Sequence, residues 1–463
     1  MLDYMKVFWG IVASVAVVNC GRTSELPGDD GYGGASSSDG GAPLISGGSG
    51  GSARGGDANT LGGAGGNGTV AVQCQTGSSR SGDIYLKNQS DVDLLGGVTQ
   101  VDGSLHITDD VADLGPLGCL REVTGSLKVY EAKVLKDLAG LEGLTTIGKA
   151  LVLGTFCDKP QAMCVGNPAL ESVSGLGNVT HLQNLTVGAC NDGEGAKPCG
   201  PNSALVRVEL NGLPSVESIS VTGSPNLTEV SFGELTRATS IQISSNSKLR
   251  ALRFPKLASV ETLSLWYSEA LEQFVVDSGI EAAKYVEISK TGLTDLGWLK
   301  LKTVSSLRIM GNPRLLSLDG LQQLQTAGSI LLDGNTALTT LEALSALISV
   351  EHELYVTNNP GLTSLTGLDG LMTAGRLYVD SNDQLSNLKG LSSLVTLREL
   401  SVLNNPQLAS LEGLESLTAL GSLSIRDNPR LAECEAERLG RQIGSALTDI
   451  VISGNNGAGA CTP

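Results

Sequence analysis

A short pattern recurs along the chain, and its clearest copy runs from Val304 to Leu324. In that copy Leu307 and Ile309 flank Arg308, and Asn312 follows three residues after Ile309. A constant period in the twenties is typical of a solenoid, in which each repeat forms one coil. The residues equivalent to Ile309, called reference residues below, recur at a nearly constant interval as Val221, Ile243, Leu265, Ile288, Leu332, Val356, Val379, Val402 and Ile425.

Each reference residue follows another apolar residue by two positions. This alternation is the pattern of a half-buried strand. The first strand is expected at Ile84 to Leu86. Three residues after the reference residue lies Asn246, Asn312, Asn335, Asn359, Asn382, Asn405, Asn428 or Asn455. An amide side chain has both donors and an acceptor, so stacked copies are predicted to bond one another and the main chain at a bend.

These repeats predict a mainly β fold, a right-handed solenoid of parallel strands with about 16 coils. The last coil is longer than the others. Within it the segment from Glu433 to Leu447 carries Leu439, Ile443 and Leu447 at helical spacing, so a short C-terminal helix is expected to cover the last apolar layer.

The run from Val304 to Leu315 resembles the strand and turn of a leucine-rich repeat. Several strands open with Gly-Ser-Leu, which makes the chain more similar to the receptor L domain, at Gly103-Ser104-Leu105, Gly125-Ser126-Leu127 and Gly421-Ser422-Leu423. That domain is the ligand-binding β-solenoid of the insulin and epidermal growth factor receptors, and it also occurs in bacterial and fungal surface proteins. The resemblance covers roughly residues 83 to 461. It implies the fold but not a receptor kinase role, because the cysteine-rich modules and the kinase of those receptors are missing.

The first twenty residues read as an export signal, because Lys6 precedes an apolar run that is too short to span a bilayer. The end of this run, Val17-Val18-Asn19-Cys20, resembles the cleavage box of a bacterial lipoprotein, in which Cys20 would be lipidated. An ordinary secretory signal is the alternative. The predicted location is the cell envelope, facing the periplasm or the exterior, with a lipid anchor as the only membrane attachment; the alternative is secretion. Residues 21–73 are rich in Gly and Ser and predict a flexible tether, and residues 74–463 form the solenoid domain.

The cysteines predict a disulfide framework formed in an oxidising compartment. Two coils are longer than their neighbours, and each holds a close cysteine pair, so two loops tied by Cys157–Cys164 and Cys190–Cys199 are expected. These tied loops would serve either for binding or as tolerated insertions. Cys434 and Cys461 occupy equivalent positions in adjacent coils and are predicted to pair. By elimination, Cys74 would pair with Cys119.

The formal charge of −17 opposes binding to nucleic acid or to anionic lipid. His106, His181 and His352 lie in different coils without metal-binding spacing and are expected at the surface. Asp333 and Asp380 lie two coils apart, too far for a glycosidase pair unless Thr357 takes part. No catalytic residue, metal or cofactor is therefore predicted, and the chain is not expected to be an enzyme. A carbohydrate-active β-solenoid enzyme is the remote alternative.

One outward face of the strands gathers aromatic and basic side chains. The candidate ligand-binding residues are Trp266, Tyr285, Arg308, Tyr355, Arg376 and Tyr378. Tyr and Arg are favoured anchors at interfaces. In the alternative interpretation, residues such as Tyr355 and Tyr378 form a cross-strand ladder that only stabilises the sheet.

These features favour a monomeric recognition or adhesion module at the cell surface. It would bind a protein or a glycan through the sheet face or the two tied loops. The alternative is a structural scaffold or spacer of the cell envelope. The sequence does not identify the ligand.

Overall fold

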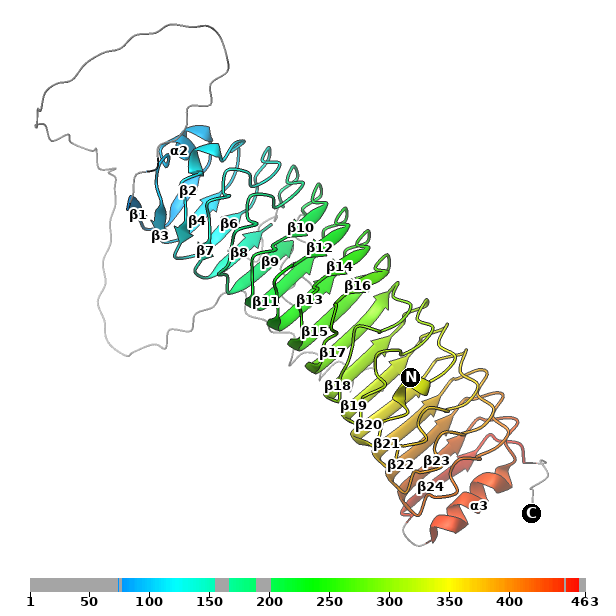
Figure 1. Cartoon of the computed structure of the whole chain (residues 1–463). Helices are drawn as coiled ribbons and strands as arrows, with labels where there is room; N and C mark the ends of the chain where they lie inside the picture. Colours follow the sequence, from blue (N-terminus) through cyan, green and yellow to red (C-terminus); the bar gives the residue numbers. More distant parts are fainter. Residues whose placement is uncertain (1–73, 75–76, 155–165, 189–200, 445–446, 458–463) are drawn as a thin grey trace, which may run out of the picture. The chain divides into compact units, whose positions relative to one another are not determined.

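The computed structural model describes residues 74, 77–154, 166–188, 201–444 and 447–457, which form a row of stacked coils (Figure 1). The predicted signal segment, the tether, both tied loops and Cys461 lie outside these residues.

One parallel sheet of 16 strands runs through the stacked coils, and it confirms the predicted fold class. Its register places the reference residues opposite one another, with Ile309 opposite Leu332 and Leu332 opposite Val356. These three side chains have no exposed surface, so the reference residues form one apolar row of the core. In sheet order the strands are β2 (Ile84–Leu86), β4 (Leu105–Ile107), β6 (Leu127–Val129), β8 (Ala150–Leu153), β9 (Asn184–Gly188), β11 (Ser215–Thr222), β13 (Arg237–Ser244), β15 (Ser259–Ser268), β17 (Ala282–Thr291), β18 (Thr303–Met310), β19 (Thr326–Asp333), β20 (Ser349–Thr357), β21 (Thr373–Asp380), β22 (Thr396–Leu403), β23 (Ala419–Arg426) and β24 (Asp449–Ser453).

A sheet of four short strands accompanies the first coils. It is separated from the large sheet by glycines that approach the previous coil closely. A Cβ atom at Gly103 would lie 2.4 Å from the carbonyl oxygen of Gly82, and one at Gly125 would lie 2.6 Å from that of Gly103. From β11 onward, the segment equivalent to the short strand and the segment equivalent to the strand of the large sheet form one continuous, longer strand. The four strands are β1 (Ser79–Ser81), β3 (Gln100–Asp102), β5 (Glu122–Val123) and β7 (Thr146–Ile147).

Another four-stranded sheet forms in the middle coils and was not expected from the sequence. Here apolar residues recur two apart, as in Leu252 and Phe254, whereas other coils place a leucine at every third residue. A period of two matches a strand, so these segments pair as a sheet. The strands are β10 (Arg207–Glu209), β12 (Glu229–Ser231), β14 (Ala251–Arg253) and β16 (Gln273–Val275).

Phenylalanines in or directly after the strands of this middle sheet stack inside the core. The ring centroids of Phe232 and Phe254 are 5.2 Å apart, and those of Phe254 and Phe274 are 5.5 Å apart. Trp298 in the next coil continues the contact, 4.4 Å from Phe274. The aromatic stack therefore ties four successive coils together.

The predicted asparagine ladder is confirmed. Asn335 Nδ2 donates to the carbonyl oxygen of Ile309 at 2.9 Å, and the backbone nitrogen of Asn335 donates to Asn359 Oδ1 at 3.0 Å. The same two kinds of bond recur through Asn382, Asn405 and Asn428, and all of these side chains are fully buried. Buried main-chain groups at the bend are thereby paired, as burial requires.

The residue before each ladder asparagine takes a left-handed backbone conformation, which turns the chain out of the strand. Gly311 and Gly334 do so with φ of 60° and 67°, while Asn358 and Asn404 do so with φ of 54° and 53°. Glycine and asparagine tolerate this region best, which explains why they recur there.

The two ends of the sheet differ. At the N-terminal end, a Cys74–Cys119 disulfide with Cα atoms 5.3 Å apart and helix α2 (Gln89–Asp93) accompany β2, and Leu86 is buried. At the C-terminal end, helix α3 (Glu433–Ile443) contacts β23 and β24, and it ends before the predicted Leu447.

Within the described residues the last strand, β24, stays partly uncovered, since Ile450 is 51% exposed. The predicted cap is therefore present as a helix but leaves part of the last apolar layer open. Cys434 is disulfide-bonded, and its predicted partner Cys461 lies outside the described residues. The described residues also contain two single-turn 3-10 helices, η1 (Gly115–Leu117) and η2 (Glu342–Leu344).

Candidate functional site

The six predicted ligand-binding residues all occupy outward positions of the large sheet, but only three of them meet. Tyr355 on β20 lies directly opposite Tyr378 on β21, and Arg376 on β21 lies two residues before Tyr378. Successive outward residues of one strand share a face, about 7 Å apart along the chain. Tyr355, Tyr378 and Arg376 are called the tyrosine face below.

Two tyrosine rings form the centre of the tyrosine face. The ring centroids of Tyr355 and Tyr378 are 4.5 Å apart and their planes differ by only 5°. Burial raises the pKa of the Tyr355 hydroxyl to about 12, and the Glu353 carboxylate adds to this effect. Burial also raises the pKa of Tyr378. Both hydroxyls therefore remain protonated at neutral pH and can donate hydrogen bonds.

A chain of three charged side chains runs beside the two rings. Arg376 Nη1 lies 3.3 Å from Glu353 Oε1, and Arg376 Nε lies 3.4 Å from Glu399 Oε2. Glu353, Arg376 and Glu399 occupy the same position of β20, β21 and β22. Two carboxylates thus hold the guanidinium in place, which lowers the conformational entropy that it would lose on binding a ligand.

The other three candidates are more dispersed. Arg308 shares the row of the tyrosines but is separated from Tyr355 by Leu331. It adjoins Glu287, whose pKa is raised by burial, while the positive charge of Arg308 opposes that rise. Tyr285 and Trp266 lie in other rows, opposite serine or threonine residues. The six candidate residues therefore form one compact pair of tyrosines with Arg376, while Arg308, Tyr285 and Trp266 stand apart from it.

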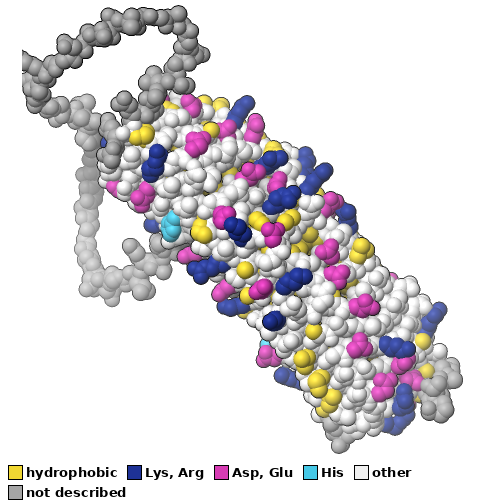
Figure 2. All heavy atoms as spheres, viewed as in Figure 1, with side chains coloured by type: hydrophobic (Ala, Val, Ile, Leu, Met, Phe, Trp, Pro, Cys, Tyr) yellow, Lys and Arg dark blue, Asp and Glu magenta, His cyan; other side chains and the backbone are white. Residues whose placement is uncertain are grey.

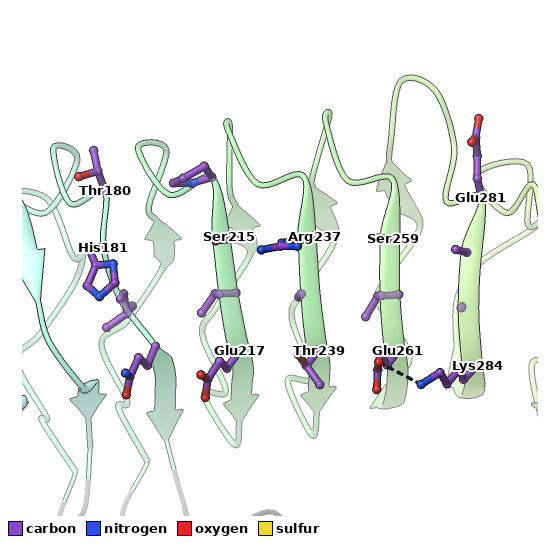
Figure 3. Close-up of a pocket in the computed structure, with 18 of the residues that line it drawn as sticks. Thr180, His181, Ser215, Glu217, Arg237, Thr239, Ser259, Glu261, Glu281 and Lys284 are labelled. Atoms are coloured by element: carbon purple, nitrogen blue, oxygen red, sulfur yellow. Dashed lines mark hydrogen bonds and ion pairs between the residues drawn. The ribbon is translucent and has the colours of Figure 1, made fainter.

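A groove of about 940 Å³ crosses the coils from β9 to β18 and was not anticipated from the sequence. Figure 3 shows its two polar rows, with Ser215, Arg237 and Ser259 in one and Glu217, Thr239, Glu261 and Lys284 in the other. Small buried residues separate the rows, namely Val216, Ala238, Val260 and Ala283. This arrangement forms a trough along the solenoid axis.

The two polar rows of the groove carry both acidic and basic side chains. Lys284 Nζ pairs with Glu261 Oε1 at 3.0 Å, and Figure 3 marks this contact. Arg237 is exposed and makes no ion pair with any residue that the structure describes. Acidic and basic side chains are also interspersed over the face of the solenoid seen in Figure 2. The charges alone give the groove no preference for an anionic or a cationic ligand.

The expectation that all three histidines lie at the surface is wrong for His106. His181 and His352 are exposed, but His106 is only 5% exposed. Its ring stacks on Tyr85 at 4.3 Å between centroids, and its Nδ1 lies 3.3 Å from the Tyr130 hydroxyl oxygen. The aromatic neighbours in adjacent coils bury the imidazole, which a single-coil pattern does not reveal.

The two aspartates that share an outward row are engaged in hydrogen bonds. Thr357 Oγ1 donates to Asp333 Oδ1 at 2.6 Å, and Asn404 Nδ2 donates to Asp380 Oδ1 at 2.9 Å. Thr357 thus lies between the aspartates and bonds the first of them. Within the described residues no group of three or more His, Cys, Asp or Glu side chains is arranged to hold a metal ion. In the same residues, no helix has the length and apolarity needed to cross a bilayer.

Sequence reasoning missed two parts of this surface. Glu399 was overlooked because it is an isolated acidic residue until the register places it beside Arg376. The groove was overlooked because its small apolar residues read as ordinary core positions. A usable signal was present, since Val or Ala recurs five residues before the reference residue in six consecutive coils, from Val216 to Ala327.

No protein-family model matches the chain. It is 24% identical over 250 residues to a "Cell surface GPI-anchored protein" of Arthroderma benhamiae, which covers 53% of this chain and 64% of that protein. It is 25% identical over 257 residues to "Cell wall protein ecm33" of Schizosaccharomyces pombe, covering 54% and 59%. A match to "Protein ecm33" of Aspergillus fumigatus is 24% identical over 147 residues, covering 30% and 37%.

The chain spans less than two thirds of the length of each of these relatives. Two of the three are named as proteins of the cell surface or cell wall, and none of the three names describes an enzyme. All three relatives are fungal, whereas the segment ending at Cys20 resembles a bacterial lipoprotein signal. Lipidation of Cys20 stays a prediction, because that residue lies outside the described part of the chain.

Proposed function

We propose that this protein is a non-enzymatic recognition module of the cell surface, which binds a protein or glycan ligand through the tyrosine face. The main observation behind this proposal is a pair of stacked tyrosines on one sheet. Beside them lies a guanidinium that is held by two carboxylates. Tyr and Arg dominate binding energy at many interfaces. The cell-surface and cell-wall names of the relatives support the location, and the resemblance to receptor L domains supports a ligand-binding role.

The tyrosine face combines several properties that favour binding. The two rings are partly buried and stacked, so they lose little freedom when a ligand covers them. Their protonated hydroxyls and the Arg376 guanidinium supply donors, and Glu353 and Glu399 supply acceptors. A surface whose polar groups are already oriented needs less ordering on association.

The test uses the full chain on an array of glycans and purified cell-surface proteins. Tyr355→Ala combined with Tyr378→Ala should abolish capture of the ligand and leave the thermal midpoint nearly unchanged. Tyr267→Ala is the control, because this tyrosine is 55% exposed and lies near the end of β15, away from the tyrosine face. Capture that survives the double substitution would refute the assignment of the binding face.

A structural envelope scaffold is the second candidate function. It is favoured by the near-parallel stacking of Tyr355 on Tyr378, which is also how cross-strand ladders stabilise sheets. In that case the double substitution would lower the thermal midpoint strongly, and the wild type would capture no ligand.

Attachment to the envelope is proposed to occur through a lipid on Cys20. The Cys20→Ser variant should then lose incorporation of a labelled fatty acid and leave the membrane fraction. Retention of the label in this variant would rule out the proposed anchor.

A further inference from the structure

A second, smaller pocket adjoins the tyrosine face. It has a volume of about 280 Å³ and is lined by His352, Glu353, Gly375, Arg376 and Arg398. His352, Gly375 and Arg398 each lie four residues before a reference residue, as do the groove residues Glu261 and Lys284. The pocket and the groove therefore share one row of the solenoid. In the groove this row carries mixed charges, whereas in the pocket it carries His352 and Arg398.

The pocket arises from an extra residue in β20. Val350 pairs with Ala374 and Glu353 pairs with Arg376, so three steps on β20 oppose two on β21. The pairing of β20 with β19 shows the same shift. Such a β-bulge re-aims side chains and is common beside functional sites. The bulged residue His352 is exposed at the rim of the pocket.

Gly375 lies against the bulged backbone and leaves the hollow beside it. A Cβ atom at this position would lie 2.2 Å from the carbonyl oxygen of His352. Only glycine fits beside the bulged backbone without a shift. Because Gly375 has no side chain while its neighbours in the row, His352 and Arg398, have long ones, a depression remains between them.

The charge of the pocket differs from that of the whole chain. Among the residues that line the pocket, Arg376 and Arg398 are basic and Glu353 is acidic, so with a neutral His352 the lining carries a net charge of +1. Arg376 is paired with Glu353 and also with Glu399, which is not a lining residue. Arg398 is exposed and forms no ion pair with the residues that the structure describes. In a chain with a formal charge of −17, this pocket presents a guanidinium that makes no ion pair with the described residues, together with an imidazole. A small anion is the complementary ligand.

We propose that this pocket binds the carboxylate of an acidic sugar residue, with Arg398 as its principal partner. This inference rests on the proposed function, because the next sugar would lie over Tyr355 and Tyr378. A guanidinium binds a carboxylate through two parallel hydrogen bonds. The volume lies near the lower end of ligand pockets, about 300 Å³, so it suits one ring-sized group rather than a peptide segment.

A chain of sugars also fits the spacing of the site. Arg376, which lines the pocket, is two residues before Tyr378 on the same strand, about 7 Å away along the chain. An acidic residue in the pocket therefore brings its neighbour to the tyrosine pair. The Arg398 guanidinium would bind the carboxylate, and the tyrosine hydroxyls would bind the hydroxyls of the adjoining sugar.

The experiment measures binding of polygalacturonate to the full chain, with the methyl-esterified polymer as the matched uncharged probe. Wild type should bind polygalacturonate, and esterification should weaken binding about tenfold or more. Arg398→Ala should cause a similar loss, and Arg398→Lys a smaller one. Arg430→Ala is the control, since Arg430 is exposed, forms no ion pair with described residues and lies outside the pocket.

Deletion of His352 gives an independent variant. It removes the bulge and brings this coil to the same length as the coils that follow it. The protein should stay folded by circular dichroism and bind polygalacturonate as weakly as Arg398→Ala.

Other results would overturn the inference. Equal or tighter binding of polyglutamate would assign the pocket to a peptide, and tighter binding of dextran sulfate would remove the preference for a carboxylate. If Arg398→Ala leaves binding unchanged while the double tyrosine variant abolishes it, the tyrosine face recognises the ligand without this pocket. Capture of a neutral glycan or a protein, with no binding of polygalacturonate, would refute the pocket assignment and retain the proposed function.

Discussion

A single ladder asparagine joins three coils. Asn359 Nδ2 donates to the carbonyl oxygen of Leu332, its Oδ1 accepts from the backbone of Asn335, and its own backbone nitrogen donates to Asn382 Oδ1. The side chain has no exposed surface. Its role follows from geometry, because the bend after each strand leaves main-chain groups that no neighbouring strand can pair.

Asn359→Ala should destabilise the protein by about 3 kcal/mol, since a buried carbonyl and a buried N–H would each lose a partner. Urea unfolding measures the change. Asn387→Ala is the matched control, because Asn387 is only partly buried and bonds within its own turn. An equal loss in both variants would show that the ladder contributes nothing beyond an ordinary turn.

The tyrosine pair should make stability depend on pH in the alkaline range. An unfolded tyrosine ionises near pH ~10, whereas the pKa of Tyr355 is raised to about 12 and that of Tyr378 is also raised. Between these values the unfolded chain has lost protons that the folded chain keeps, so the free energy of unfolding falls as pH rises.

Tyr355→Phe combined with Tyr378→Phe should flatten this decline between about pH 10 and 12. Urea unfolding at several pH values tests the slope, and the same variant at pH 7 serves as the reference. An unchanged alkaline slope would mean that the tyrosines titrate alike in the folded and unfolded chain.

At the scale of elements, the middle four-stranded sheet depends on its aromatic stack. Phe254 is fully buried and contacts Phe232 and Phe274 in the neighbouring coils. Phe254→Ala should cost about 3–5 kcal/mol through the cavity it leaves. Leu316→Ala, at a position that is 58% exposed, should be nearly neutral in the same denaturation experiment. A small loss for Phe254→Ala would indicate that the adjacent coils collapse into the space.

The strands and the ladder were predictable because each coil repeats one local pattern. The reference residues, the Ile84–Leu86 strand and the asparagines all follow from a period that the sequence displays openly. Features created between coils were not predictable in this way. The burial of His106 needs Tyr85 and Tyr130 from adjacent coils, and the charge chain needs the register that sets Glu399 beside Arg376.

The extra residue that forms the β-bulge is visible in the sequence, but its position within β20 is not. The interval from Leu332 to Val356 is longer by a single position than the intervals between the reference residues that follow. The extra residue could have enlarged a turn instead. Its placement within β20 is accompanied by Gly375 in the next strand, where a Cβ atom would lie 2.2 Å from the carbonyl oxygen of His352.

For the whole molecule, stability comes from contacts between adjacent coils, as in other solenoids. The first and last coils each contact only one neighbouring coil, so they should unfold before the internal coils. The N-terminal end is closed by the Cys74–Cys119 disulfide, whose cysteines are 45 residues apart in sequence, whereas Ile450 in the last described strand is 51% exposed.

Cys74→Ser combined with Cys119→Ser should remove about 4 kcal/mol from the N-terminal coils, on the loop-length model of disulfide stabilisation. Hydrogen exchange should show faster exchange in β2 and β4, with β18 unchanged as the internal control. In the wild type, β24 should already exchange faster than β18. Uniform acceleration along all strands would instead show that the solenoid unfolds as one cooperative unit.

The groove and the small pocket share one row of the solenoid, so the number of coils between them sets the distance between the two sites. Three strand steps separate Lys284 on β17 from His352 on β20, about 14 Å at the usual strand spacing. Gain or loss of one whole coil between β18 and β19 would change that interval by about 5 Å and leave the residues of both sites intact. Lineages that duplicate or lose repeats could thus adjust the reach between two contact points in fixed increments, without redesigning either one.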